Sequence, residues 1–130
     1  MAQEKVILFN LLDQKKGQIM KTIFEQLGVE VIRIDSKDLN ESVGYLFGVH
    51  GFKQAKREYK KTREEEVLVF HGFSKEQMEL VLDVFQGAQL PFIPYKAMTT
   101  SQNIEMPFHE FIDKVKEEYE SRLVHPGKLS

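Results

Sequence analysis

The chain has no cysteine among its 130 residues. This absence excludes disulfides, thiolate nucleophiles, zinc fingers and iron–sulfur clusters, and it is typical of a reducing compartment. We therefore expect a cytoplasmic location. Long hydrophobic runs are also missing, because the longest one near the start is only Val6–Phe9. A membrane helix needs about 20 apolar residues, so we expect no membrane segment.

An excess of one charge is lacking as well. Eighteen Lys and Arg stand against twenty Asp and Glu, which gives a net charge of −2. This balance excludes a grip on nucleic acid by the whole domain. The local exception is the basic segment, Lys53–Arg63, which is followed by the acidic Glu64–Glu66. Such a run is more often a solvated surface than a binding site, and contact with nucleic acid through it is the less favoured alternative.

The common cofactor-binding and metal-binding motifs are absent. No G-x-G-x-x-G follows the first apolar run, and no phosphate-binding G-x-x-x-x-G-K-[ST] occurs anywhere. None of the four histidines pairs with another histidine or a carboxylate at a metal-ligand spacing. We therefore expect neither a cofactor nor a metal.

The chain does contain one pattern that repeats at a spacing of 61 residues. The apolar run Val6–Phe9 recurs as Val67–Phe70, and the helical stripe within Ile19–Phe24 recurs within Leu80–Phe85. Each copy has the order strand, helix, strand, followed by a further helical stretch. The strands are expected at residues 5–11, 29–34, 66–71 and 92–95.

Capping residues mark the expected helix ends. Asp13 and Ser74 are expected N-caps, and Gln77 stands at capping-box spacing from Ser74. Gly28 and Gly87 stand where these two helices should end. A short helix is expected within residues 39–47, and a last one opens near residue 107. We expect the core to contain Val6, Leu8, Phe9, Ile23, Phe24, Val67, Val69, Phe70, Val81, Phe85, Phe111 and Ile112.

Two architectures fit this order of elements. We favour an α/β fold, a small doubly wound parallel four-stranded sheet in the order 2-1-3-4, because the helical stretch between the two copies suits a parallel crossover. The alternative is a ferredoxin-like α+β fold with an antiparallel sheet. Residues 1–124 should form a single α/β domain with a basic insert at about 50–65. Residues 125–130 should be a loose C-terminal tail.

In the parallel sheet, polar residues converge at the C-terminal edge of the strands. A crevice opens there between strands one and three, and the N-termini of the following helices favour an anion. Asp13 argues against the first helix N-terminus, since its carboxylate already lies there. The candidate ligand-binding residues are Asn10, His71, Gly72, Ser74, Lys96, Thr99 and Asn103.

Five of the polar candidates also have a purely structural explanation. His71 fits a strand-end histidine bonded to a neighbouring loop, and Ser74 is fully explained as a helix cap. Lys96 fits a lysine lying along a sheet edge, while Thr99 and Asn103 fit turn residues. We favour the structural explanation in each case, so the sequence by itself assigns no catalytic residue.

Three stretches resemble a small bacterial family known as domain of unknown function 3783. They are Val-Leu-Val-Phe-His-Gly-Phe-Ser-Lys-Glu-Gln-Met at 67–78, Ile-Pro-Tyr-Lys-Ala-Met-Thr-Thr-Ser-Gln-Asn-Ile at 93–104 and Leu-Asn-Glu-Ser-Val-Gly-Tyr-Leu-Phe-Gly at 39–48. The resemblance covers most of the chain and is best from about 66 to 118. It implies a small intracellular α/β domain with no assigned activity. It marks as family-defining Gly44, Gly72, Phe73, Ser74, Lys96, Ala97, Thr99 and Asn103.

Two functions from different classes follow from these observations. The first is a non-catalytic binding or regulatory module, because a short chain shows no catalytic constellation. The second is an enzyme or sensor for a small anionic metabolite, bound at the C-terminal edge of the sheet. The fold discriminates between them, since an antiparallel ferredoxin-like sheet would scatter the candidate residues. We favour the binding module.

Overall fold

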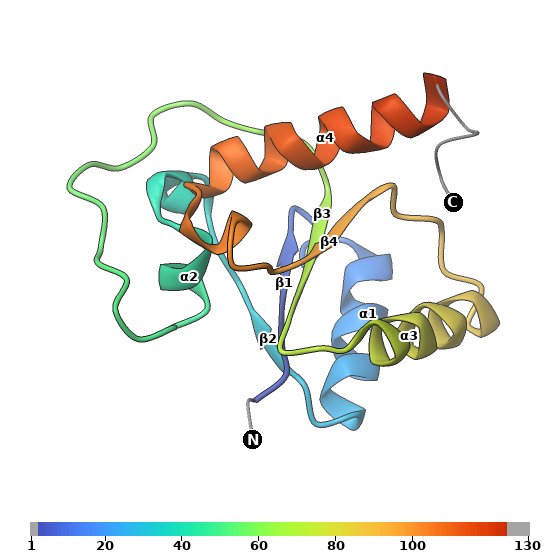
Figure 1. The fold of residues 1–130 in the computed structure, drawn as a ribbon. Coiled ribbons are helices and arrows are strands. Elements are labelled where there is room, and N and C mark those ends of the chain that lie inside the picture. Colours follow the sequence, from blue (N-terminus) through green and yellow to red (C-terminus); the bar gives the residue numbers. More distant parts are fainter. Residues whose placement is uncertain (1–2, 125–130) are drawn as a thin grey trace.

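The computed structural model describes residues 3–124, and the expected loose tail at 125–130 lies outside the described residues. Strands and helical segments alternate along the chain. The strands form one central sheet, and the helices surround it (Figure 1). In order they are β1 (Lys5–Phe9), α1 (Lys15–Gln26), β2 (Glu30–Ile32), the 3-10 helix η1 (Ser36–Asn40), α2 (Val43–Leu46), β3 (Val67–His71), α3 (Lys75–Gly87), β4 (Tyr95–Met98), the 3-10 helix η2 (Asn103–Glu105) and α4 (Phe108–Val124).

The four strands form an open sheet in the order β2-β1-β3-β4. β1 pairs with β2 in parallel and β3 pairs with β4 in parallel, but the two central strands, β1 and β3, are antiparallel. The α/β class and the strand order are therefore confirmed, whereas the expectation of an all-parallel sheet is wrong. An apolar run that is buried on both faces fits a parallel or an antiparallel neighbour equally well. The connection through η1 and α2 also begins and ends at the same end of the sheet, so it is not a parallel crossover.

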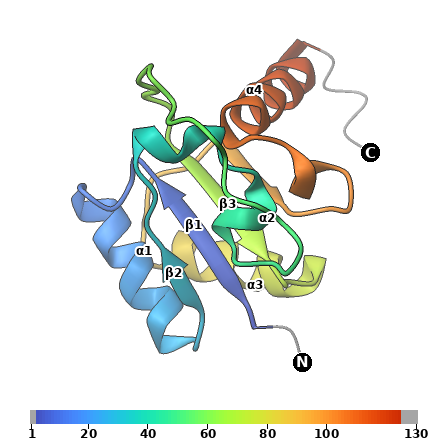
Figure 2. The same cartoon turned by 90° about the vertical axis from the view of Figure 1, so that its left-hand side faces the viewer.

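The reversed central pair places both long connecting helices on the same face. Strand–helix–strand crossovers are right-handed almost without exception. In an all-parallel sheet of this order, the two crossovers would therefore lie on opposite faces, and reversing the second unit brings its helix to the face of the first. Accordingly α1 and α3 cover one face together, and η1, α2 and α4 cover the other (Figures 1 and 2).

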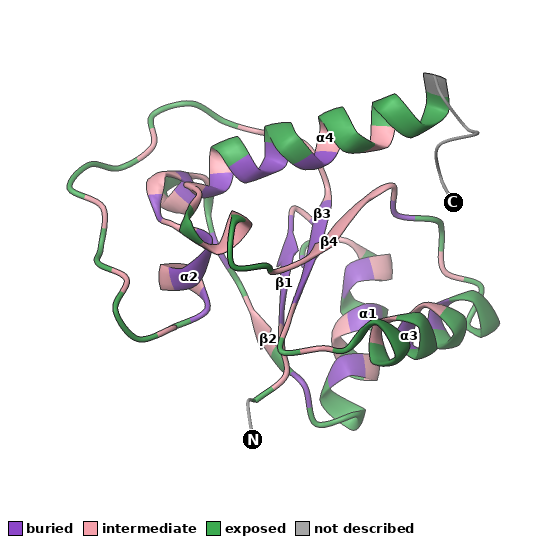
Figure 3. Ribbon diagram, viewed as in Figure 1, coloured by how far each residue is buried: buried purple, intermediate pink, exposed green. Residues whose placement is uncertain are grey.

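The sheet divides the core into two apolar layers. The layer under α1 and α3 receives from the central strands Val6, Leu8, Leu68 and Phe70. The layer under η1, α2 and α4 receives Ile7, Phe9, Val67 and Val69. All expected core residues are buried except Ile23, which is partly buried. Figure 3 shows the buried residues concentrated in the central strands and on the helix sides that face them.

The two layers show that the repeat spacing differs between the helices and the strands. The helices keep the spacing of 61, since Phe24 and Phe85 both pack in the layer of α1 and α3. In the strands the spacing is 62, because Val6 shares that layer with Leu68, while Val67 lies in the opposite layer. Side chains alternate between faces along a strand, so a slip of one residue changes the face. A run that is apolar on both sides gives no signal of that phase.

The cap of α1 differs from the expected one, and that of α3 does not. Gln14 stands at the N-cap of α1, and Asp13 pairs instead with Arg33, with 2.7 Å between carboxylate and guanidinium. At α3 the capping box is confirmed. The Ser74 hydroxyl accepts from the Gln77 backbone N–H at 3.1 Å, and the Gln77 side chain accepts from the Ser74 N–H at 2.8 Å.

The fourth strand begins three residues later than expected. It runs over Tyr95–Met98 and lies at the edge of the sheet. Pro94 directly precedes it, because a residue without an N–H cannot donate to the ladder. The shift changes the place of Lys96, which lies inside the strand rather than beyond its end.

Candidate functional site

The candidate residues do not converge on one crevice. The last residue of β1, Phe9, pairs with Val67 at the start of β3, and Lys5 pairs with His71 at its end. Asn10 and His71 therefore lie at opposite ends of the two central strands. The expected common crevice is wrong, because it requires the two central strands to run in the same direction.

Asn10 holds the chain segment that leads into β3. It adopts a left-handed backbone conformation with φ of 59°. Its side-chain amide donates to the backbone carbonyls of Arg63 at 2.8 Å and Glu65 at 2.9 Å. The Asn10 backbone carbonyl accepts from the Gln14 side chain at 2.7 Å. These bonds occupy both amide hydrogens, so the geometry gives Asn10 a structural role.

Gly72 and Ser74 form the turn between β3 and α3. Gly72 has φ of +80°, and a Cβ atom there would lie 2.9 Å from the Gln3 carbonyl oxygen. Both the backbone conformation and the close approach therefore require glycine. Ser74 caps the helix, so these two residues have complete structural explanations.

His71 and Thr99 do come together, at the end of β3 and just after β4. The His71 Nδ1 and the Thr99 Oγ1 lie 2.9 Å apart. The imidazole also stacks on Phe47, with 4.8 Å between ring centroids. Burial lowers the pKa of His71, and the nearby charge of Lys5 lowers it further. A neutral ring held between an aromatic side chain and a hydroxyl suits a packing role.

Asn103 fixes the turn that follows β4. Its side-chain oxygen accepts from the Thr100 N–H at 2.7 Å, and the Thr100 hydroxyl accepts from the Asn103 N–H at 3.0 Å. The Asn103 amide donates to the Met98 carbonyl at 3.0 Å. This set of bonds makes Asn103 the residue that ends the strand and begins η2.

Lys96 lies apart from the other candidates. It pairs in the sheet with Leu68, near the beginning of β3, and shares the face that α1 and α3 cover. The α3 N-terminus and His71 lie at the other end of β3. The expectation that Lys96 shares one crevice with Gly72 and Ser74 is therefore wrong.

The Lys96 amine is half-buried and already has two contacts. It donates to the Ile93 carbonyl at 2.8 Å and lies 4.2 Å from the centroid of the Phe92 ring. Burial lowers the pKa of Lys96, and the positive charge of Arg122 near the end of α4 lowers it further. An ammonium has three N–H donors, and only one hydrogen bond from this amine is formed within the described residues.

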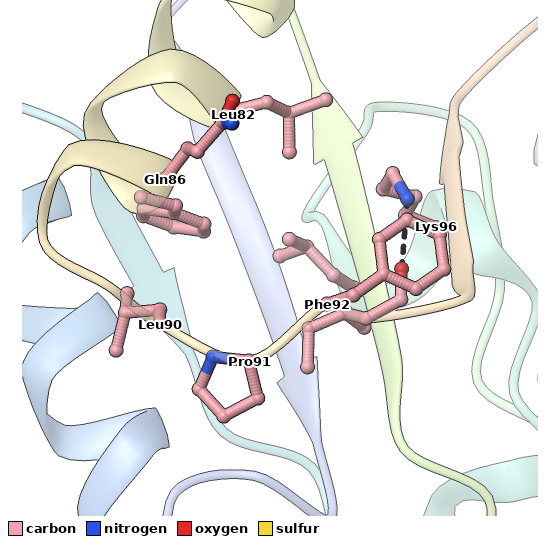
Figure 4. A pocket seen from close by; sticks show the side chains of 9 residues that line it. Leu82, Gln86, Leu90, Pro91, Phe92 and Lys96 are labelled. Atoms are coloured by element: carbon pink, nitrogen blue, oxygen red, sulfur yellow. Dashed lines mark hydrogen bonds between the residues drawn. The ribbon is translucent and has the colours of Figure 1, made fainter.

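Lys96 contributes to a pocket of about 420 Å³, which we call the Lys96 pocket (Figure 4). Its apolar walls come from Leu82 and Phe85 of α3, from Leu68 of β3 and from the loop Leu90–Ile93. Two polar side chains, Gln86 and Lys96, complete the lining. A mostly apolar cavity of this size with few polar groups is typical of small-molecule sites.

The sequence analysis identified some residues of this pocket but did not predict that they lie together. Lys96 was a candidate binding residue, and Phe85 was an expected core residue of α3. The joining element is the loop Leu90–Ile93, whose position depends on where the edge strand begins. Six consecutive apolar or proline residues, 90–95, stand directly before Lys96 and were the available signal.

The basic segment follows an irregular path along the face of α2 and α4 (Figure 1). The Ala55 N–H donates to the Glu41 carboxylate at 2.7 Å, and Tyr59 stacks on His109 with 5.0 Å between centroids. The lysines themselves are exposed. Contact with nucleic acid through this segment stays the less favoured alternative.

No cluster of three or more metal-ligating side chains occurs in residues 3–124. Over the same residues, no helix is long and apolar enough to cross a membrane.

The structure thus combines an α/β fold around a mixed sheet with an amphipathic cavity beside α3. Residues 66–121 match the family model described as Domain of unknown function (DUF3783), which confirms the resemblance seen in the sequence. The match includes every residue that lines the Lys96 pocket. The stretch at 39–48 lies outside it. No curated protein and no solved structure matches the chain.

Proposed function

We propose that this protein is a non-catalytic binding module that takes an amphipathic monocarboxylate in the Lys96 pocket. The observation that carries the proposal is the combination of apolar walls with a single half-buried cation. A hydrocarbon tail would occupy the space between α3 and the loop Leu90–Ile93. The carboxylate would accept hydrogen bonds from the N–H groups of Lys96 that do not bind the Ile93 carbonyl.

The full positive charge of Lys96 favours an anion in the pocket. The C-terminal end of α3, which borders the pocket, carries a smaller partial negative charge that opposes an anion. Arg122 is a second cation and lies close enough to lower the pKa of Lys96. A bound carboxylate would offset the repulsion between the two cations.

The lining supports binding rather than catalysis. Among the residues that line this pocket, Lys96 is the only titratable group. General acid–base catalysis needs a proton donor or acceptor within hydrogen-bond reach of the reacting group, and nucleophilic catalysis usually needs an adjacent base. No such partner lines the cavity with Lys96.

The test is calorimetric titration with straight-chain carboxylates of increasing length and with the alcohols of the same length. Burial of each CH₂ is worth about 0.8 kcal/mol, so affinity should rise by about fourfold per added carbon until the pocket is full. Each carboxylate should bind more tightly than its alcohol.

The Lys96→Met variant should remove the advantage of the carboxylate and leave alcohol binding nearly unchanged. Lys75→Met is the matched control, since Lys75 is exposed at the opposite end of α3. The proposal is wrong if affinity does not depend on chain length, or if the two variants bind carboxylates equally. Equal binding of acetate or phosphate would favour the small-anion alternative.

A further inference from the structure

A second opening lies on the other side of α3, on the same face of the sheet. We call it the α1–α3 groove. Its walls come from Leu27 at the end of α1 and from Leu80 and Val84 of α3, and it encloses about 190 Å³. None of its lining residues lines the Lys96 pocket. The proposed carboxylate site therefore leaves this groove unused.

The groove exposes apolar side chains that the fold does not cover. Leu80 is 64% exposed, Leu27 is 50% exposed and Val84 is 41% exposed. Leu80 and Val84 are four residues apart and therefore neighbours on one side of α3. The adjacent stripe of the same helix, Val81 and Phe85, is buried in the core. Thus α3 has one apolar stripe for the core and a second one beside it.

Acidic side chains border the exposed stripe. Glu76 and Asp83 stand four residues before and three residues after Leu80, so both lie next to it on the helix surface. Glu4 lines the groove itself. None of these three carboxylates forms an ion pair within the described part of the chain. The only basic residue of α3 is Lys75, at its first position.

We propose that the α1–α3 groove binds a cationic amphipathic helix of a partner protein. Two antiparallel helices leave a furrow that a third helix can enter with one apolar stripe. Lysine or arginine side chains beside that stripe would meet Glu4, Glu76 and Asp83. Anionic lipid surfaces and nucleic acids are disfavoured, because their charge has the same sign as the groove border.

The basic segment of a second copy does not match this groove. Lys53–Arg63 is cationic, but it is an irregular stretch, and its two apolar residues are engaged within the fold, Ala55 by its N–H to Glu41 and Tyr59 by stacking on His109. It offers charge without the apolar anchors that Leu27, Leu80 and Val84 require. The expected occupant therefore has a leucine-type stripe flanked by basic residues.

The probe is a fluorescently labelled synthetic helical peptide with leucines at i and i+4 and lysines beside them. A scrambled peptide of the same composition is the control. Anisotropy titrations with the full chain should show saturable binding of the patterned peptide, weakened by salt. Leu80→Ser should reduce affinity by about tenfold, as for a central interface anchor. Leu123→Ser, which removes an equally exposed leucine from α4, should have no effect.

Two double variants that each remove two negative charges complete the test. Glu76→Gln with Asp83→Asn should weaken binding several-fold and reduce its salt dependence, whereas Glu117→Gln with Glu120→Gln on α4 should not. Carboxylate binding in the Lys96 pocket should stay intact in all of them, so the two proposals fail separately. The inference is overturned by equal binding of the scrambled peptide, by absence of saturable binding, or by self-association of the wild type that Leu80→Ser abolishes.

Discussion

The two faces of the sheet are closed in different ways. On the face of η1, α2 and α4, residues 53–66 run outside the helices and are held by hydrogen bonds and ion pairs. On the face of α1 and α3, no segment of residues 3–124 covers the helices in this way, and both sides of α3 show an opening. Hydrogen bonds and ion pairs therefore hold a chain segment over the first face, which we call the closed face, whereas the second face keeps two openings with mainly apolar walls.

The ion pairs of the closed face centre on Glu65. Its carboxylate accepts from the Arg63 guanidinium at 3.0 Å and from the Lys116 amine at 2.8 Å, and Arg63 also pairs with Asp113 at 2.6 Å. The hydrogen bond from Arg63, followed by that from Lys116, lowers the pKa of Glu65 to about 2, although burial opposes the shift. The network fixes the entry to β3 against α4.

The largest expected effect comes from the core layer under α1 and α3. Phe70→Ala in β3 should cost about 3–5 kcal/mol of unfolding free energy, because it leaves a cavity in a fully buried position. Phe92→Ala is the control on the surface, since Phe92 is 69% exposed, and it should cost less than about 1 kcal/mol. Urea denaturation measures both. Similar losses for the two variants would contradict the assignment of the core.

Removing the charge of Glu65 should have the next largest effect. Glu65→Gln should cost about 1.5–3 kcal/mol, the range for hydrogen bonds to charged groups. Glu118→Gln removes an exposed i, i+4 pair with Lys114 at 3.9 Å and should change stability by less than about 0.5 kcal/mol. If the two variants unfold at the same urea concentration, the closed face does not depend on this network.

The same network predicts the pH dependence of stability. The pKa of Glu65 is lower in the folded protein, about 2 against a usual 4.5, so its stabilising contribution is complete above about pH 4.5. That contribution should be lost progressively as the pH falls towards about 2. The difference in unfolding free energy between wild type and Glu65→Gln should therefore shrink across this interval. A difference that stays constant down to pH 2 would contradict the lowered pKa.

Neutral replacement of the exposed lysines in the basic segment should have the smallest effect. Replacing Lys53, Lys56, Lys60 and Lys61 by Gln should leave the fold intact, because the segment is held by Ala55, Tyr59 and Arg63 rather than by these side chains. If the wild type shows salt-sensitive nucleic-acid binding, the variant should lose it. Circular dichroism and a filter-binding assay measure the two outcomes. Unfolding of the variant would contradict this account of the anchors.

The sequence predicted those parts of the fold that local patterns determine. Helical stripes placed Phe24 and Phe85 in the core, and the spacing of Ser74 and Gln77 identified a real capping box. The relative direction of β1 and β3 was not predictable in this way, because it depends on a long connection and not on either strand. Apolar runs on both faces also hid the strand phase.

The candidate site was less predictable for the same reason. Asn10, His71 and Lys96 appeared to belong together only under the assumption of parallel central strands. The structure separates them and brings Lys96 to the apolar loop that precedes β4. That association depends on Pro94, which delays the start of the strand and brings Lys96 into it.

The most direct test of the difference between the two faces is a ¹H–¹⁵N correlation spectrum of the full chain titrated with a medium-chain carboxylate such as octanoate. The account predicts saturable shifts confined to the residues from Leu82 to Lys96, with residues 53–66 unchanged. Saturable shifts centred on residues 53–66, or no saturable shifts from Leu82 to Lys96, would contradict it.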